Sequence, residues 1–224
     1  MVLNFPALKK SLENNGGSIF RYADHENTVL NKLKDDLYAI QPADMNELAN
    51  FISQITEWKV DKTKHEGPRN MIDLADVVRS VYYSPTAGGS NSLKKILPAI
   101  INDAPGIKEL YSKQDLYGKG KNYSSRNFSS HVWITEETDY DPYQTLPPIP
   151  QFEGIDENFF DDDLTKIADG SAAMMAYNKL QWSHITEQES LALREALLKY
   201  CELDTLAMVM LVQGLMELNN RTSY

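Results

Sequence analysis

The chain has 224 residues, 42% of them hydrophobic and 24% charged, which excludes an extended disordered protein and is enough apolar material for one packed domain. Its formal net charge of −10 excludes recognition of nucleic acid by the overall field, so such binding needs a local basic patch or bridging metal ions. The single cysteine, Cys201, excludes an internal disulfide, and no apolar run reaches the roughly 20 residues of a membrane helix, so we expect a cytoplasmic protein without membrane contact.

The first quarter of the chain predicts helices and one strand. Residues 5–14 have the pattern of a short helix that ends at an Asn-Gly-Gly turn. Aromatic and β-branched residues predict a strand over residues 18–23. Leucines at helical spacing predict a helix over residues 26–37, and a second apolar face predicts another over residues 43–58. The polar residues 59–70 are expected to form a loop.

The middle of the chain alternates between helix and irregular backbone. Residues 71–83 should begin extended and continue as a helix that stops before Pro85. A helix is expected over residues 93–102, where Pro98 would produce a kink or a break. Residues 112–163 show no lasting periodicity and are interpreted as a long irregular insertion, with a short strand at 131–134.

The C-terminal part predicts two helices within residues 170–219. They are separated near residues 183–186, where Thr186 and Glu189 have the spacing of a capping box. The whole chain therefore reads as predominantly helical, with too few strands to build a full sheet unaided.

Tyr200 and Asp204 are the most informative pair of residues in the chain. They lie four residues apart in a predicted helix, so both side chains project from one face. A phenol beside a carboxylate is typical of two-metal nucleases, where the carboxylate binds a divalent ion and the phenol orients the attacking water. The alternative is a partly exposed pair joined by a hydrogen bond, with no further function.

One region combines basic and aromatic side chains. It contains Lys94, Lys95 and Arg126, together with the residues Tyr117, Lys119, Lys121, Tyr123 and Phe128. Such a mixture can bind a single nucleic acid strand through its phosphates and stacked bases. The alternative is a solvated loop with buried aromatic anchors. The four histidines lie on unlike elements without metal-ligand spacing, so no histidine metal site is expected.

Several segments together resemble one bacterial family. They are residues 17–22 followed by Glu26, then residues 73–74, 82–85, 89–98, 141–147, 169–173 and 200–209. In this order they resemble the domain of unknown function 2779, which is assigned to the DnaQ-like 3′-5′ exonucleases of the ribonuclease H fold. The resemblance extends over nearly the whole chain.

The resemblance implies a particular set of site residues. DnaQ-like enzymes use four carboxylates, of which two form an Asp-x-Glu motif on the first strand and the last lies in Tyr-x-x-x-Asp. Tyr200 and Asp204 match that last motif, and Glu26 matches the third acidic residue. Glu26 and Asp204 are then the implied ligands of Mg²⁺ or Mn²⁺, and Tyr200 the residue that positions the attacking water.

The first Asp-x-Glu motif has no counterpart in this interpretation. The only such triplet, Asp24-His25-Glu26, is followed at once by a predicted helix and not by a second strand, so it reads as the third acidic site. We therefore expect an α/β, predominantly helical chain: a partial ribonuclease H-like exonuclease fold with the first strands absent, forming a single incomplete domain over residues 1–224.

The expected function follows from these implications. It is a metal-dependent 3′-5′ exonuclease-like hydrolase that acts on a single-stranded end of nucleic acid. Because the leading carboxylates are missing, we expect weak metal binding and little or no hydrolysis by the isolated chain. The alternative is a non-catalytic helical interaction module that pairs with a partner chain, which would supply the missing strands.

Overall fold

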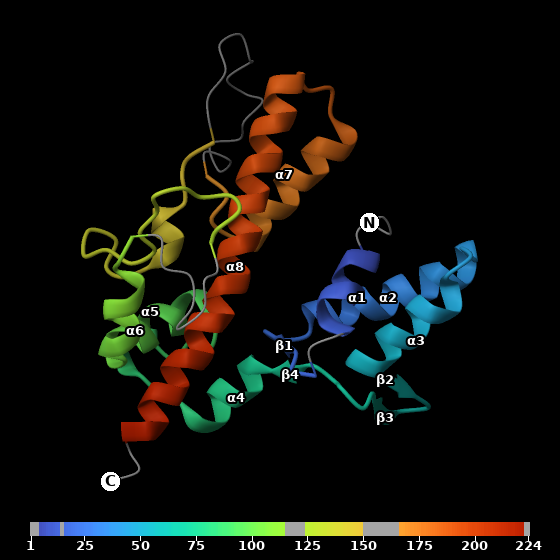
Figure 1. Cartoon of the computed structure of the whole chain (residues 1–224), viewed down its shortest axis with the longest axis horizontal. Coiled ribbons are helices and arrows are strands. Elements are labelled where there is room, and N and C mark those ends of the chain that lie inside the picture. The colour runs from blue at the N-terminus through green and yellow to red at the C-terminus, as the bar shows by residue number, and fades with distance from the viewer. Residues whose placement is uncertain (1–4, 14–15, 115–123, 150–165, 222–224) are drawn as a thin grey trace. The chain divides into compact units, whose positions relative to one another are not determined.

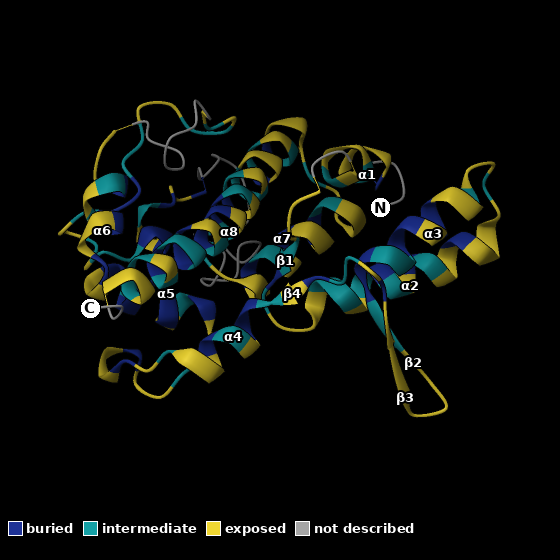
Figure 2. Ribbon diagram, turned by 60° about the horizontal axis from the view of Figure 1, so that its bottom comes forward, coloured by how far each residue is buried: buried dark blue, intermediate teal, exposed yellow. Residues whose placement is uncertain are grey.

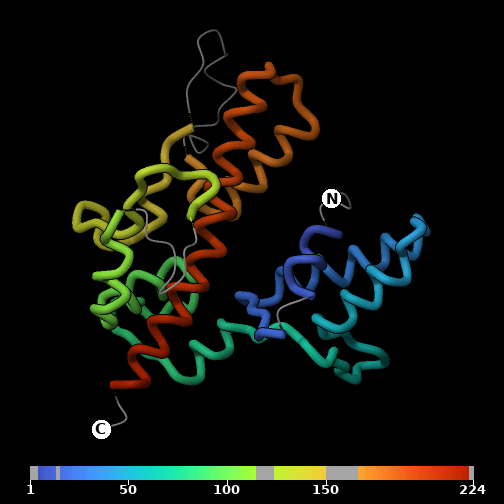
Figure 3. The backbone as a smooth tube through the Cα atoms, viewed as in Figure 1, coloured from blue at the N-terminus to red at the C-terminus, as the bar shows by residue number. Residues whose placement is uncertain are grey.

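The computed structural model describes residues 5–13, 16–114, 124–149 and 166–221. The chain divides into two compact units, Met1–Tyr83 and Ser84–Tyr224, which Figures 1 and 3 trace from blue to red. Each unit is described by itself, and the single incomplete domain expected from the sequence stays a prediction. Over the described ranges, no helix is both long and apolar enough to cross a membrane.

The first unit combines helices with two very small sheets. Its elements are α1 (Phe5–Glu13), β1 (Phe20–Arg21), α2 (His25–Ile40), α3 (Met45–Ile55), β2 (Glu57–Val60), β3 (Thr63–Glu66), β4 (Ile72–Asp73) and α4 (Leu74–Val81). β1 pairs with β4 in parallel, and β2 pairs with β3 in antiparallel. A parallel pair needs a crossover connection, which α2, α3 and the β2–β3 hairpin provide here.

The core of this unit lies between α2 and α3. Leu30, Leu33 and Leu37 recur at helical spacing on α2, and all three are buried. They pack with apolar residues of α3 such as Phe51 and Ile52, and in Figure 2 the two helices run side by side. The leucine periodicity in the sequence thus correctly located the helix that carries Glu26 in its first turn.

The sequence-based boundaries were wrong in three places. The strand expected over residues 18–23 is only two residues long, and the helix expected over residues 43–58 ends at Ile55. The loop expected over residues 59–70 contains most of the β2–β3 hairpin. This hairpin closes through Asp61 and Lys62, which adopt φ of 46° and 67°. A two-residue hairpin turn with positive φ at both residues usually has the sequence Asn-Gly or Asp-Gly, whereas this turn contains no glycine.

The second unit is built around one long helix. Its elements are η2 (Pro85–Ala87), α5 (Leu93–Asp103), α6 (Pro105–Tyr111), η3 (Pro142–Thr145), α7 (Gly170–Trp182) and α8 (Glu187–Arg221). α8 packs against α5, α6 and α7. At Gly214 a Cβ atom would overlap the side chain of Ile100, so α5 and α8 approach closely because this position has no side chain.

Two expectations for the second unit can be compared with the structure directly. The break between α7 and α8 is confirmed, and so is the capping box, because the Thr186 N–H donates to Glu189 Oε2 at 2.6 Å. The strand expected over residues 131–134 is wrong. Trp133 and Ile134 are buried in irregular backbone, where the Ile134 N–H donates to the Tyr111 carbonyl at 3.2 Å.

Two further expectations concern Pro98 and the insertion. α5 continues through Pro98 without the break that was considered. Of the insertion expected over residues 112–163, the described part is irregular apart from η3, while residues 115–123 and 150–163 lie outside the described ranges. The chain is thus predominantly helical with a few short strands, as predicted from the sequence.

Candidate functional site

Tyr200 and Asp204 lie one turn apart on α8, as the sequence predicted. Tyr200 is 9% exposed, and Asp204 is half-buried. A third residue completes the pair: the hydroxyl of Tyr143 donates a hydrogen bond to Asp204 Oδ1 at 2.7 Å. The Tyr143 and Tyr200 rings have centroids 6.4 Å apart. The carboxylate of Asp204 is therefore next to two phenols from separate segments of the chain.

Local sequence explains why Tyr143 is fixed at this place. Asp141 precedes η3, and its Oδ1 accepts a hydrogen bond from the Tyr143 N–H at 3.0 Å. Pro142 occupies the first position of the 3-10 turn, where its fixed φ is favourable. The Tyr143 side chain is only 2% exposed. Its hydroxyl is thus held in one position by backbone capping and by packing.

Lys94 places a cation close to this group. It lies in the first turn of α5, with Nζ 5.3 Å from the centroid of the Tyr143 ring and 6.0 Å from that of Tyr200. The ammonium group also donates to the carbonyl of Ala168, immediately before Asp169, whose carboxylate caps α7 through the Ala172 N–H. Four separate segments of the chain thus meet around Lys94.

Burial and charge set the protonation of these groups. Burial lowers the pKa of Lys94, while the carboxylates of Asp169, Asp204 and Asp141 oppose that change. Burial also raises the pKa of Tyr143 and of Tyr200, and the negative charge of Asp204 raises both further. Both phenols therefore keep their protons at neutral pH, and the hydroxyl of Tyr143 donates to Asp204.

A cavity of about 330 Å³ is lined in part by Lys94. Its lining includes Lys94, Lys95, Asn102, Asp141 and Gln144. This volume is at the lower end of the range for small-molecule pockets. Two lysines, two amides and two carboxylates, those of Asp139 and Asp141, make its wall polar, which suits a charged group better than an apolar one.

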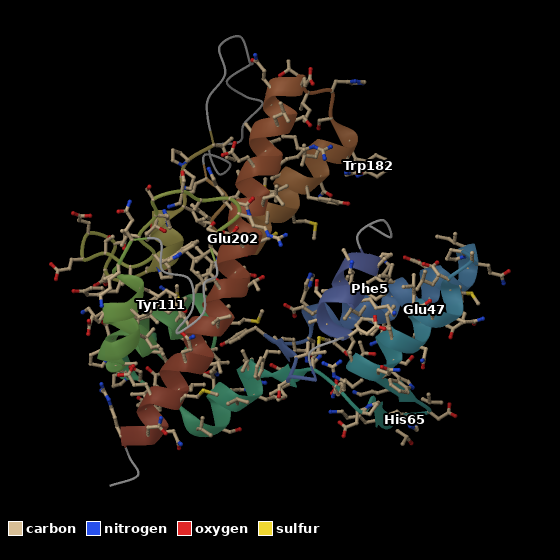
Figure 4. The ribbon with its side chains drawn as sticks, in the orientation of Figure 1. Phe5, Glu47, His65, Tyr111, Trp182 and Glu202 are labelled. Atoms are coloured by element: carbon tan, nitrogen blue, oxygen red, sulfur yellow. The ribbon has the colours of Figure 1, made fainter. Side chains whose placement is uncertain are left out.

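Arg126, which was grouped with these lysines on sequence grounds, is not part of that cavity wall. It is exposed, on a loop that Asn127 attaches to α8: the Asn127 backbone N–H and side-chain amide both donate to Glu202 Oε2. Glu202 is labelled on α8 in Figure 4. Lys119, Lys121, Tyr117 and Tyr123 lie outside the described ranges.

The first unit contains Glu26 and a separate group of charges. Glu26 is half-buried in the first turn of α2, where the helix dipole favours a carboxylate. Nearby, the buried guanidinium of Arg21 forms ion pairs with Asp24 at 3.3 Å, Glu57 at 3.5 Å and Asp73 at 3.7 Å. Arg21 and Asp73 are also register partners in the β1–β4 pair.

The structure thus brings together only part of the predicted site. Tyr200, Asp204 and Lys94 meet in the second unit, whereas Glu26 belongs to the first, and its role as a metal ligand stays a prediction. Among the residues that the structure describes, no three His, Cys, Asp or Glu side chains are grouped so as to hold a metal ion. The described residues therefore do not form a complete ligand set.

Sequence reasoning missed Tyr143 and Asp169 as members of the site. Both lie in segments that carry the family resemblance, residues 141–147 and 169–173. An Asp followed by Pro-Tyr, and an Asp before Gly-Ser at a helix start, are capping signals and gave no reason to assign a role near Asp204. The missing information was the spatial meeting of segments about 60 residues apart in sequence, such as Tyr143 and Asp204.

Comparison with known proteins gives one match. Residues 3–92 match the model of a family described as Domain of unknown function (DUF2779). The matched residues include the whole described part of the first unit and the start of the second, and they end before Tyr143 and Asp204. The match supports the family named in the resemblance over less than half of the chain. No curated protein and no solved structure matches the chain.

Proposed function

We propose that this chain contributes Tyr200 and Asp204 to an exonuclease-like site that acts on a single-stranded end of nucleic acid. The observation that carries the proposal is the environment of Asp204, whose carboxylate accepts from Tyr143 and lies near Tyr200 and Lys94. A carboxylate is the ligand type that Mg²⁺ and Mn²⁺ prefer, and an ammonium group is a suitable partner for a phosphate.

Two observations on the first unit support the same proposal. The parallel pair β1–β4 with helices in its crossover is the unit from which α/β sheets are built. Residues 3–92, which contain this pair and Glu26, match the family that the sequence resembles. The finer assignment, a ribonuclease H-like fold of the DnaQ-like class, remains part of the proposal.

The proposal assigns a limited role to this chain's own residues. Asp204 would supply one metal ligand, fixed in orientation by Tyr143, while Tyr200 would donate a hydrogen bond to the attacking water. A bound divalent ion would supply positive charge at the scissile phosphate. Because the described residues lack a full ligand set, we expect weak metal binding, completed by Glu26 and by carboxylates from a partner chain.

Thermal melts with and without a divalent ion test the proposal. At ten times Kd, binding to the folded state adds about 1.4 kcal/mol, which for a chain of this size raises Tm by roughly 3–5 °C. We expect such a rise with excess Mn²⁺ relative to EDTA, and we expect Asp204→Asn to abolish it. The control is Asp36→Asn on an exposed position of α2, which should keep the full rise.

The quantity compared is the Tm in Mn²⁺ minus the Tm in EDTA, measured for each variant. A general loss of stability in Asp204→Asn lowers both Tm values and leaves this difference interpretable. Identical melts of the unmodified chain in EDTA and in Mn²⁺ would overturn the metal assignment. A rise that survives in Asp204→Asn would place the ion elsewhere and remove Asp204 from the site.

A second candidate function is the interaction module. In the described part of the chain, β1 and β4 pair only with each other, which leaves sheet edges that a partner strand could join. In addition, α7 exposes large apolar side chains, including Met174, Tyr177 and Trp182. Light scattering, together with binding of an apolar dye, separates the two candidates. A monomer by light scattering that also binds no dye would count against a module that pairs with a partner.

A further inference from the structure

The β2–β3 hairpin of the first unit contributes almost nothing to the core. Every residue of β3 is exposed, and only Glu57 and Trp58 of β2 are half-buried. Figure 2 shows the hairpin extending away from α2 and α3 as a largely exposed ribbon. An isolated two-stranded hairpin is marginal in water, so its persistence here needs another explanation than hydrophobic burial.

Polar contacts with α2 hold the base of the hairpin in place. The side-chain amides of Asn27 and Asn31 both donate to the Glu57 carbonyl, at 3.0 and 2.9 Å. The Glu57 N–H in turn donates to Asn27 Oδ1 at 2.9 Å. Both backbone polar groups of Glu57 are thus paired with side chains from one helix, and the hairpin leaves that helix in a fixed direction.

Two aromatic rings face each other across the strands. Trp58 and His65 are register partners, and their rings are stacked, with centroids 6.0 Å apart and an interplanar angle of 18°. His65 is exposed and is labelled at the hairpin in Figure 4. The half-buried ring of Trp58 and the exposed ring of His65 are nearly parallel, and accessible aromatic rings provide a flat surface on which nucleic acid bases stack.

Lysines surround these rings. Lys34 Nζ lies 4.9 Å from the centroid of the Trp58 ring, and Lys64 forms an ion pair with Glu57 at 2.8 Å. Lys32 and Lys59 form no ion pair with any residue that the structure describes. Three carboxylates, Asp24, Asp35 and Glu57, lie on the same surface, but Asp24 pairs with Arg21 and Glu57 with Lys64. In a chain with a net charge of −10, the remaining lysines form a local surface that can accept phosphates.

The hairpin and α2 enclose a cavity of about 630 Å³. Trp58 and the same four lysines, Lys32, Lys34, Lys59 and Lys64, belong to its lining. This volume is within the range of small-ligand pockets and is large enough for a nucleotide. We infer that this surface binds single-stranded nucleic acid, with bases stacked beside Trp58 and His65 and phosphates on Lys34 and Lys59.

A peptide strand added to the hairpin edge is the competing occupant. Lysines along an exposed strand oppose such pairing, and they favour an anionic ligand. The inference rests on the proposed function only for its choice of ligand class. It needs neither Asp204 nor a metal ion, so its test is carried out in EDTA, where a failure of the metal site has no effect.

The test measures binding of a fluorescently labelled 20-nucleotide oligodeoxythymidylate to the full chain by anisotropy, at 50 mM salt in EDTA. We expect affinity that falls with increasing salt. The double variant Lys34→Gln/Lys59→Gln should bind roughly tenfold more weakly and with a smaller salt slope, because two phosphate contacts are lost. The control Lys10→Gln/Lys113→Gln removes two other exposed lysines and should bind like the unmodified chain.

A second readout reports on stacking. In the background Trp182→Phe, which removes an indole that is 85% exposed, the oligonucleotide should quench the Trp58 emission, and Trp58→Phe should remove that quenching. Should Trp58→Phe fail to fold, the lysine pair still tests the inference. An equal loss of affinity in Lys34→Gln/Lys59→Gln and in its control would overturn the inference. So would a loss of affinity seen only in a third double variant, Lys95→Gln/Arg126→Gln, in the second unit. Binding of a lysine-free acidic peptide without binding of the oligonucleotide would also overturn it.

Discussion

In the first unit three carboxylates surround the buried guanidinium of Arg21, whereas in the second unit the carboxylate of Asp204 meets the hydroxyl of Tyr143. The first arrangement compensates a cation that burial has removed from water, so the largely buried carboxylates of Glu57 and Asp73 serve the fold. The second gives a carboxylate a neutral donor on one oxygen. Among the residues that the structure describes, none forms a salt bridge with Asp204, so its charge remains available to a further cation. We therefore propose Asp204, and not the carboxylates around Arg21, as a ligand of the ion.

The largest effect that tests this comparison is expected at Arg21. Its side chain is 4% exposed, and Arg21→Met would leave the carboxylates of Glu57 and Asp73 without their common partner. Breaking a buried ion pair on one side costs about 3–5 kcal/mol. We expect that loss in the free energy of unfolding, measured by urea denaturation followed by circular dichroism.

The control for Arg21 is Arg79→Met, because Arg79 is 49% exposed and pairs with Asp76 on the surface of α4. An exposed pair contributes at most about 1 kcal/mol, so this variant should be close to the unmodified chain. An equal effect of the two substitutions would mean that Arg21 does not organise the first unit, and the contrast between the units would disappear.

A smaller effect is expected at Tyr143. Tyr143→Phe keeps the buried ring and removes only the hydroxyl that donates to Asp204. A hydrogen bond to a charged group contributes about 1.5–3 kcal/mol, which should appear as a lower urea midpoint with an unchanged slope. Tyr83→Phe, at a side chain 83% exposed, is the matched control and should have no effect.

Tyr143→Phe also sharpens the comparison between a structural and a positioning role. If Tyr143 fixes the orientation of Asp204, the variant should show a smaller rise in Tm with Mn²⁺ than the unmodified chain. A variant that is less stable but keeps the full Mn²⁺ effect would show that the hydroxyl serves the fold alone.

The smallest effect concerns acid pH and the first unit. The hydrogen bond from Lys64 chiefly lowers the pKa of Glu57 below its ordinary value of 4.5, with smaller contributions from Asn70 and Arg21. Between this lowered pKa and pH 4.5 the unfolded chain binds more protons than the folded chain. The stability that the Glu57 carboxylate contributes is therefore present above pH 4.5 and is lost as the pH falls through the lowered pKa. We expect Glu57→Gln to flatten the decline of stability with acid, measured by urea denaturation between pH 7 and pH 3.

Glu66→Gln is the control, because Glu66 is exposed at the other end of the same register pair. It should leave the acid slope unchanged. An unchanged slope in Glu57→Gln would mean that the charge of Glu57 is not coupled to folding, and that the carboxylates around Arg21 act independently.

The helices were predictable because their apolar periodicity coincides with their burial. Leu30, Leu33 and Leu37 gave both the type and the buried face of α2. The hairpin was not predictable, since β2 and β3 bury almost nothing and their turn lacks glycine, so neither alternation nor turn chemistry marked it. The strand expected at 131–134 failed for the opposite reason: Trp133 and Ile134 are buried by loop packing, which has no periodicity.

The candidate site shows the same limit. Tyr200 and Asp204 could be found from sequence because a helix places residues four apart on one face. Tyr143 could not, because its contact with Asp204 joins segments whose spacing carries no local rule. Lys94 was selected from sequence for a different reason, its neighbourhood of basic and aromatic residues, and the structure places it beside both tyrosines instead.

A substitution at Gly214, on α8, is expected to affect the surroundings of Tyr143 and Tyr200 indirectly. A methyl group at this position would meet the side chain of Ile100, and the simplest relief is a displacement of α5. Lys94 belongs to the same short helix, six residues earlier, so its ammonium group would travel with that displacement. The separation of α5 and α8 at Gly214 thereby influences the distance between the Lys94 ammonium group and Asp204. Gly214→Ala is therefore expected to change that distance although Gly214 lies further along α8 than Asp204.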